Sequence, residues 1–270
     1  MPFEFLVSQG RIADRSPGAI RGARLAADAL RNLVGLEPLV IGAPSAHKID
    51  DWSSSLPEAL ETLNALQHAI SAIFARGNMP LIVANTCSAS LATLPIVARN
   101  CPDAAVLWID AHGDFNTPAT TMSGYLGGMV LAAGCGLWDS GLGAGIAPKN
   151  VVVAGARDID LEEQSALRDA GVQVFSVGET RPEAILKAIG DRPVWIHIDW
   201  DVLEPGLIPA AYAISDGLAP TALRALLQAI PRSQIAGIEL AEFEASDDEA
   251  VNAAALTCMV ETVSPLWLNR

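Results

Sequence analysis

The 270-residue sequence has few basic residues, because 17 Lys and Arg stand against 31 Asp and Glu, for a formal net charge of −14. A surface of this sign repels nucleic-acid backbones and anionic membranes, so neither is an expected partner. The amino terminus lacks the basic region of a secretory signal peptide, and none is predicted. The longest stretch without charge, residues 115–138, is interrupted by Pro118 and several glycines and is not expected to span a membrane.

Cysteine is also scarce. Cys87, Cys101, Cys135 and Cys258 lie far apart without CxxC spacing, which argues against a disulfide framework and fits a reducing compartment. We therefore expect a cytoplasmic protein. Disorder is excluded, because 51% of the residues are hydrophobic and only 18% are charged.

Eight short apolar segments predict β-strands. Most are continuous runs, as expected when both faces of a parallel sheet are covered. The expected strands are residues 3–7, 38–41, 80–84, 104–109, 151–154, 172–177, 194–198 and 235–240. Helical patterns lie between them, at residues 17–33, 57–75, 89–98, 126–133, 161–170, 182–189, 220–229 and 248–263. With no long linker or internal repeat, the sequence predicts one α/β domain over residues 1–270, with three α/β/α layers and a mainly parallel, eight-stranded sheet.

Polar residues follow the expected strand at residues 104–109. If the chain stays extended there, Asp110, His112 and Asp114 share one face and converge on one point. Two carboxylates this close at the end of an apolar strand are costly to desolvate unless a cation accompanies them. The pattern predicts a metal site; the alternative is a set of solvated loop acids.

A second acidic pair follows the expected strand at residues 194–198. Asp199 and Asp201 again share a face, and the carboxyl ends of parallel strands lie at one edge of a sheet. Clusters rich in oxygen with one imidazole suit Mn²⁺ or a similar ion better than structural zinc. Two such ions bridged by a carboxylate could hold a hydroxide between them as a nucleophile.

These motifs resemble those of the arginase/agmatinase ureohydrolases. The likeness rests on Asp-Ala-His-x-Asp-x-Asn at 110–116 and Asp-x-Asp at 199–201, and extends to Arg157-Asp158-x-Asp160, Glu239-x-x-Glu242 and residues 18–33. It implies an arginase-like catalytic domain of eight parallel strands. It also implies a metal-dependent hydrolase of linear amidines, with two Mn²⁺ ions per chain. Members of the family are often trimeric or hexameric, which leaves a homo-oligomer open.

The resemblance also implies metal ligands. Asp110 and Asp199 match the residues that bridge the two ions, and Asp114 completes one site. His112 and Asp201 complete the other. Asp114 is further implied to accept or relay a proton during catalysis.

Substrate-binding residues are implied in the same way. Glu242 matches the acid that holds the guanidinium end of the substrate. Asn116, Thr121 and Ser123 match groups that receive an α-carboxylate, and Asp160 matches the acid facing an α-amino group. A guanidino amino acid is therefore expected as the substrate in preference to a decarboxylated amine such as agmatine. The alternative for Asn116, Thr121 and Ser123 is ordinary turn chemistry.

Two positions depart from the family pattern. Cys87 stands where a histidine ligand is usual, and as a thiolate it would bind Mn²⁺ less well, so that site is expected to be weaker. The alternative is that Cys87 is a buried hydrophobic residue and the first site is half empty. Gly127 stands where arginases have a histidine credited with proton transfer, and without it the poor alkylamine leaving group of arginine should be harder to expel.

An N-hydroxylated guanidine is less basic and depends less on that acid. The two departures together resemble the branch of the family that hydrolyses Nω-hydroxy-L-arginine to L-ornithine and hydroxyurea in the biosynthesis of the antibiotic D-cycloserine. This is the leading hypothesis. An arginase or another guanidino-amino-acid ureohydrolase is the first alternative.

Two further alternatives are a metal-independent hydrolase with Cys87 as nucleophile, activated by His112 or by the helix beginning near Ser88, and a non-catalytic binding module. His197 lies two residues before Asp199 and is interpreted as a supporting or core residue. The other interpretation is that it replaces the missing ligand.

Overall fold

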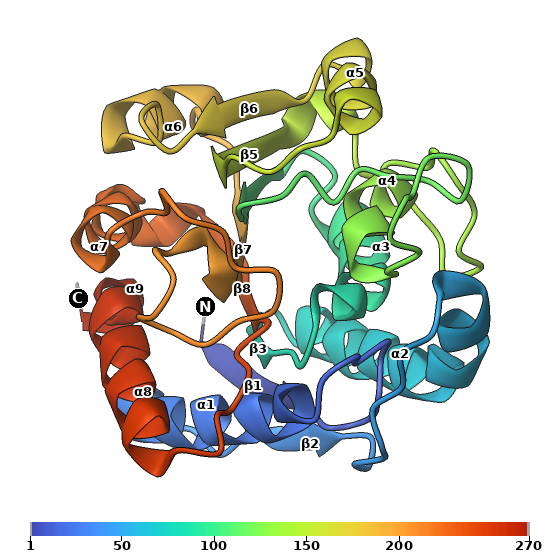
Figure 1. Ribbon diagram of the computed structural model, residues 1–270. Coiled ribbons are helices and arrows are strands. Elements are labelled where there is room, and N and C mark those ends of the chain that lie inside the picture. Colours follow the sequence, from blue (N-terminus) through green and yellow to red (C-terminus); the bar gives the residue numbers. More distant parts are fainter. Residues whose placement is uncertain (1, 269–270) are drawn as a thin grey trace.

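Eight parallel strands form one sheet in the computed structural model, which describes residues 2–268 (Figure 1). The strands are β1 (Phe3–Ser8), β2 (Leu39–Ile41), β3 (Met79–Val83), β4 (Ala105–Ile109), β5 (Val151–Ala156), β6 (Gln173–Ser176), β7 (Val194–Asp199) and β8 (Ile235–Ala241). Their order across the sheet is β2-β1-β3-β8-β7-β4-β5-β6. All neighbouring pairs are parallel. The predicted α/β class and eight-stranded parallel sheet are confirmed.

Helices cover both faces of this sheet (Figure 1). They are α1 (Gly18–Val34), α2 (Trp52–Ala75), α3 (Ser90–Asn100), α4 (Val130–Gly134), α5 (Leu161–Ala170), α6 (Pro182–Ile189), α7 (Pro220–Ala229), α8 (Glu249–Val263) and α9 (Pro265–Leu268). One hydrophobic core packs α1, α6, α7 and α8 against the sheet, and a second packs α2, α3, α4 and α5 against the opposite face. Three layers result.

The continuous apolar strands reflect this double burial. Along β4, Leu107 and Ile109 belong to the first core, whereas Val106 and Trp108 belong to the second. Alternate residues of a strand point to opposite faces, so a strand that is covered on both sides needs apolar residues at successive positions.

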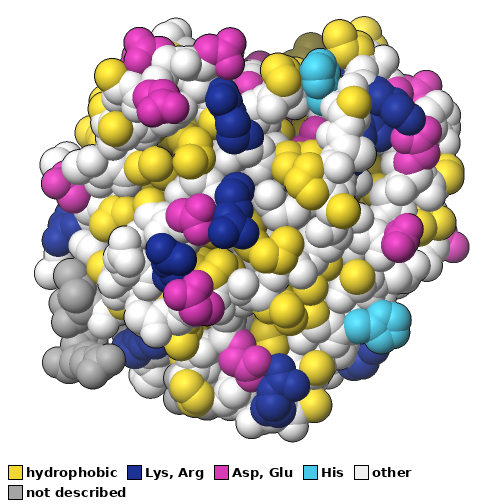
Figure 2. All heavy atoms as spheres, turned by 90° about the horizontal axis from the view of Figure 1, so that it is seen from below, with side chains coloured by type: hydrophobic (Ala, Val, Ile, Leu, Met, Phe, Trp, Pro, Cys, Tyr) yellow, Lys and Arg dark blue, Asp and Glu magenta, His cyan; other side chains and the backbone are white. Residues whose placement is uncertain are grey.

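The edge strand β2 is less covered. Leu39 and Val40 are 58% and 44% exposed. Figure 2, which views the molecule from below Figure 1, shows hydrophobic side chains scattered among charged groups of both signs. None of the helices within residues 2–268 combines the length and hydropathy that crossing a bilayer requires.

Helix α2 begins earlier than predicted, at Trp52 and not at Pro57. The side chain of Asp51 accepts hydrogen bonds from the backbone N–H groups of Ser53 and Ser54 and so caps the first turn. Pro57 lies inside the helix, where it removes one backbone donor from the second turn. The capping acid, and not the proline, sets the start of this helix.

Candidate metal centre and substrate cavity

The side chains predicted to bind metal come together where the central strands end. Asp110 directly follows β4, Asp199 is the last residue of β7, and Cys87 begins a 3-10 helix after β3. Because β3, β8, β7 and β4 are neighbours in the sheet, their carboxyl ends lie beside one another. Topology therefore gathers residues that are far apart in the sequence.

Three groups of ligand-type side chains have donor atoms within 4.8 Å of one another. The groups are Asp110, His112 and Asp201; Cys87, Asp199 and Glu242; and Cys87, Asp110 and His197. Five of the six residues predicted as ligands occur in them. Asp114, the sixth, lines the cavity beside these groups. Its assignment as a ligand stays a prediction.

His112 is held by two of the acids. Its Nδ1 lies 3.0 Å from Asp201 Oδ2 and 3.4 Å from Asp110 Oδ1. Burial alone would lower the pKa of His112, but these contacts raise it well above its ordinary value. Asp110 is fixed further, because Trp108 Nε1 donates to its Oδ2 at 2.8 Å. The imidazole and the two carboxylates are thus close enough together to bind one cation.

Several buried acids of this site have raised pKa values, although the hydrogen bond with His112 lowers the pKa of Asp110. Burial raises the pKa of Glu242 to about 8, and burial together with Asp110 raises that of Asp201 to about 6. The pKa of Asp114 is raised by burial and by Asp110, and that of Asp199 by burial and by Asp201. A divalent cation would offset this repulsion. The donor set of carboxylates, two imidazoles and one thiol therefore fits a pair of borderline divalent ions.

Two of the acids that line the cavity have unusual backbone conformations. Asp114 has φ 48° and Glu242 has φ 65°, in the left-handed region that favours glycine. Non-glycine residues in this region carry strain and cluster at functional sites. Glu242 is the first residue after β8, and its side chain lines the cavity.

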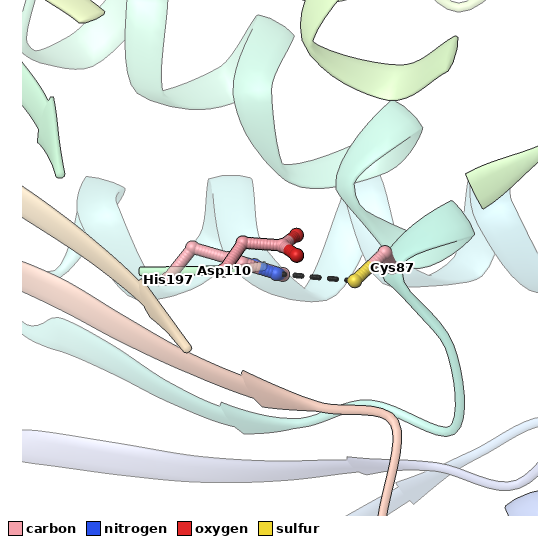
Figure 3. Close-up of side chains that lie close together, drawn as sticks. All are labelled: Cys87, Asp110 and His197. Atoms are coloured by element: carbon pink, nitrogen blue, oxygen red, sulfur yellow. Dashed lines mark hydrogen bonds between the residues drawn. The ribbon is translucent and has the colours of Figure 1, made fainter. Parts of the chain in front are cut away.

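Cys87 is buried and faces the same centre. Its Sγ lies 3.2 Å from Asp199 Oδ2 and 3.3 Å from His197 Nε2 (Figure 3). Its backbone N–H donates to Glu242 Oε1 at 2.8 Å. Burial and the nearby Asp199 raise the pKa of the thiol well above its ordinary value. A thiolate here requires a cation or a proton acceptor beside it.

His197 adjoins the Cys87 thiol and is buried, in the kind of position that the sequence analysis gave it as a supporting or core residue. Its Nδ1 lies 3.1 Å from Glu239 Oε2, and its ring stacks on Trp108 with centroids 3.5 Å apart. The three residues are aligned across β4, β7 and β8, where Trp108 pairs with His197 and His197 with Glu239. Ser90 Oγ, 2.7 Å from Glu239 Oε2, donates to this acid as well. Figure 3 shows the imidazole directed at Cys87, the contact that the sequence alternative gave to His112.

A cavity of about 200 Å³ adjoins this centre. It is lined by Cys87, His112, Asp114, Asn116, Ser123, Tyr125, Gly127, Gly128, Asp158, Asp160, Glu163, Asp199, Asp201, Tyr212 and Glu242. Most residues predicted for metal and substrate binding are therefore on its walls.

The predicted amino-acid-binding residues differ in their placement. Asn116 and Ser123 line the cavity, whereas Thr121 Oγ1 accepts a hydrogen bond from the backbone N–H of Gly124 at 3.1 Å. Asp160 lines the cavity and also caps α5 by accepting from Glu163 N. Thr121 thus supports the turn that carries Ser123, as the alternative of turn chemistry expected.

Several lining residues were not found by sequence reasoning. Glu163 lies in the first turn of α5, three residues after Asp160, and its Oε1 accepts from Phe115 N at 2.7 Å. Burial raises the pKa of Glu163 to about 7. Tyr125 donates its hydroxyl to Glu242 Oε1 at 2.9 Å. The spacing from Asp160 could have indicated Glu163, but no local pattern marks Tyr125 or Tyr212.

Comparison with known proteins agrees with this geometry. The model of the arginase family matches residues 1–263. N(omega)-hydroxy-L-arginine amidinohydrolase of Streptomyces lavendulae is 52% identical over 98% of this chain and 97% of its own length. Arginase of Brevibacillus brevis is 33% identical over 72% of both chains. The crystal structure of arginase from Bacillus subtilis superimposes with a TM-score of 0.86 at 22% identity, covering 100% of this chain and 99% of that one, and so supports the fold.

Proposed function

Because the chain belongs to the arginase family, a family of guanidino hydrolases, we propose that it hydrolyses Nω-hydroxy-L-arginine to L-ornithine and hydroxyurea. The observation that carries this proposal is the 52% identity along nearly the whole chain to a protein named for that substrate. Water adds its oxygen to the guanidino carbon, the bond from that carbon to the ornithine nitrogen breaks, and the nitrogen takes a proton. Supply of hydroxyurea for D-cycloserine biosynthesis is the role that follows.

Two Mn²⁺ ions fit the donor set. Asp110 and Asp199 would be shared between them, Cys87 would complete one site with Asp114, and His112 and Asp201 would complete the other. Activation of water at neutral pH is the chemistry that such ions supply when bound.

Glu242 and Asp114 line the cavity, and each has a buried carboxylate oxygen without a partner in the described part of the chain. Glu242 Oε1 already accepts from Cys87 N and Tyr125 Oη, whereas Oε2 has no hydrogen-bond partner among the described residues. That free oxygen would accept a hydrogen bond from the guanidino end of the substrate. Asp114 Oδ2 is likewise buried without a partner in residues 2–268 and can take a proton and return it to the leaving nitrogen.

Residues at the other end of the cavity fit the amino-acid part. Asn116 and Ser123 offer hydrogen-bond donors to a carboxylate, and Asp160 and Glu163 offer carboxylates to an ammonium group. The two kinds of group are neighbours, because Asn116 Nδ2 donates to Asp160 Oδ2 at 3.3 Å. An α-amino acid matches this arrangement better than a simple amine.

The test is a comparison of substrates with the Mn²⁺-loaded protein. Ornithine and hydroxyurea should form from hydroxyarginine at a higher kcat/KM than ornithine forms from arginine. Equal or reversed values would identify a plain arginase. The Ser123→Ala variant, which lacks one hydrogen-bond donor to the α-carboxylate, should raise KM for hydroxyarginine. An unchanged KM, or turnover of agmatine by the parent as fast as that of hydroxyarginine, would refute recognition of the amino-acid end.

A thiol hydrolase is the second candidate, because Cys87, His197 and Glu239 form a thiol, imidazole and carboxylate series. The raised pKa of the Cys87 thiol beside Asp199 weighs against it, since the nucleophile must be a thiolate. Full activity in excess EDTA, with a covalent adduct on Cys87 detected by mass spectrometry, would favour this candidate over the metal-dependent one.

A further inference from the structure

Tyr125 occupies the space into which a side chain at position 127 would project. A Cβ atom added to Gly127 would lie 2.4 Å from Tyr125 Cε1 and 3.0 Å from its Cζ. Gly127 begins a 3-10 helix (Gly127–Met129), a conformation open to any residue, so the backbone does not demand glycine there. A side chain at position 127 is therefore excluded by the Tyr125 ring and not by the backbone conformation.

The ring of Tyr125 is fixed on its other sides. The Arg15 guanidinium lies over it, 5.0 Å from the centroid, and the Tyr212 ring is 5.2 Å away. Arg15 is itself held, because it donates to the backbone oxygen atoms of Asp50 and Ser123. Tyr125 cannot move aside without breaking these contacts and its own hydrogen bond to Glu242.

That hydrogen bond is one of two that occupy the same oxygen of Glu242. Tyr125 Oη and Cys87 N both donate to Oε1, at 2.9 Å and 2.8 Å. Oε2 of this buried side chain has no partner within residues 2–268, and Glu242 lines the cavity. The two donors thus leave one carboxylate oxygen for the guanidino group.

We propose that Tyr125 determines the guanidino selectivity of this site, as a positioning residue for Glu242 and as the group that excludes a proton-donating side chain from position 127. The inference rests on the proposed function for the identity of the substrate. A site without that donor favours a less basic guanidino group, such as an N-hydroxylated one, whose cleavage depends less on an external acid. Tyr125 and Gly127 therefore act as a pair, because a larger side chain at position 127 needs a smaller one at position 125.

Four variants of the Mn²⁺-loaded full chain test this pair: Tyr125→Phe, Tyr125→Ala, Gly127→His, and Tyr125→Ala combined with Gly127→His. Tyr125→Phe keeps the ring but loses the hydroxyl, so its melting midpoint should stay within about 2 °C of the parent. Its KM for hydroxyarginine should rise about ten-fold, with kcat changed less than about three-fold.

Gly127→His alone should lower the melting midpoint by about 4–10 °C, because the new side chain overlaps the Tyr125 ring. In the Tyr125→Ala background the same change should lower the midpoint by less than about 2 °C. The double variant should also raise the kcat/KM ratio of arginine to hydroxyarginine at least ten-fold over Tyr125→Ala, as a restored general acid would.

Equal loss of melting temperature from Gly127→His in both backgrounds would overturn the inference, and so would an unchanged KM in Tyr125→Phe. A parent enzyme that prefers arginine would refute the proposed substrate instead. In that case the role of Tyr125 would still be decided by two measurements. One is the difference between the melting-midpoint changes that Gly127→His causes in the two backgrounds, and the other is the KM of Tyr125→Phe for arginine.

Discussion

Binding of Mn²⁺ should reverse the sign of the pH dependence of stability. Without metal, the folded protein holds protons on acids whose pKa values are raised, at about 6 for Asp201 and about 8 for Glu242, against ordinary values of 3.8 and 4.5. His112, with its raised pKa, also keeps a proton that the unfolded chain loses near its ordinary value of 6.5. The folded state then binds more protons than the unfolded state, so the free energy of unfolding falls as pH rises from about 4 to about 8.

The size of this fall follows from the same groups. One pKa unit corresponds to about 1.4 kcal/mol, so Asp201 alone lowers the free energy of unfolding by about 3 kcal/mol between about pH 4 and neutral pH. For a chain of this length that is a decrease of about 6–10 °C in melting midpoint. Bound Mn²⁺ requires the ligands deprotonated, so the folded state then binds fewer protons and stability rises with pH. At about 100 times the dissociation constant, each ion adds about 2.7 kcal/mol.

Melting curves by circular dichroism, from about pH 5 to about pH 8 in EDTA or in saturating Mn²⁺, measure both slopes. The Asp201→Asn variant is the matched control: it should reduce the slope in EDTA and lose about half of the gain from Mn²⁺. Parallel slopes in the two conditions would refute the assignment of these acids as a cation site. A rising slope in EDTA would refute the raised pKa values themselves.

Three other changes have defined outcomes. Cys87→Ala should reduce bound manganese, measured by mass spectrometry, from two ions per chain toward one; two retained ions would show that the thiol is no ligand. Glu239→Gln should destabilise the fold by about 1–3 kcal/mol in chemical denaturation, because it removes the charge that His197 faces, and an unchanged midpoint would contradict that contact. Glu163→Gln should stabilise the metal-free protein by up to about 3 kcal/mol above pH 7, where the parent carboxylate must ionise despite burial, with no difference near pH 4.5; equal stabilities at pH 8 would contradict the raised pKa.

The sheet and the acids at its edge could be predicted because both have local signals. Continuous apolar runs indicated strands covered on both faces, and Asp110 and Asp199 stand directly where such runs end. The start of α2 was wrong because two signals competed, and capping by Asp51 outweighed Pro57.

The supporting residues needed information that no local pattern carries. His197 could be placed beside Glu239 and Trp108 only with the register of β4, β7 and β8. The hydrogen bond from Tyr125 to Glu242 joins residues 117 positions apart, and its dependence on Gly127 is a matter of volume. The sequence showed that Gly127 stands where arginases have a histidine. It could not show that the Tyr125 ring occupies the space of that side chain.

The left-handed backbone at Asp114 and Glu242 bears on attempts to engineer this enzyme. Glycine at either position would relieve about 1 kcal/mol of conformational strain and remove the desolvation of a buried acid. Screens that select only for heat resistance should therefore enrich substitutions at these two positions, and the survivors would be sturdier but inert. A library built for thermostability should hold both residues constant.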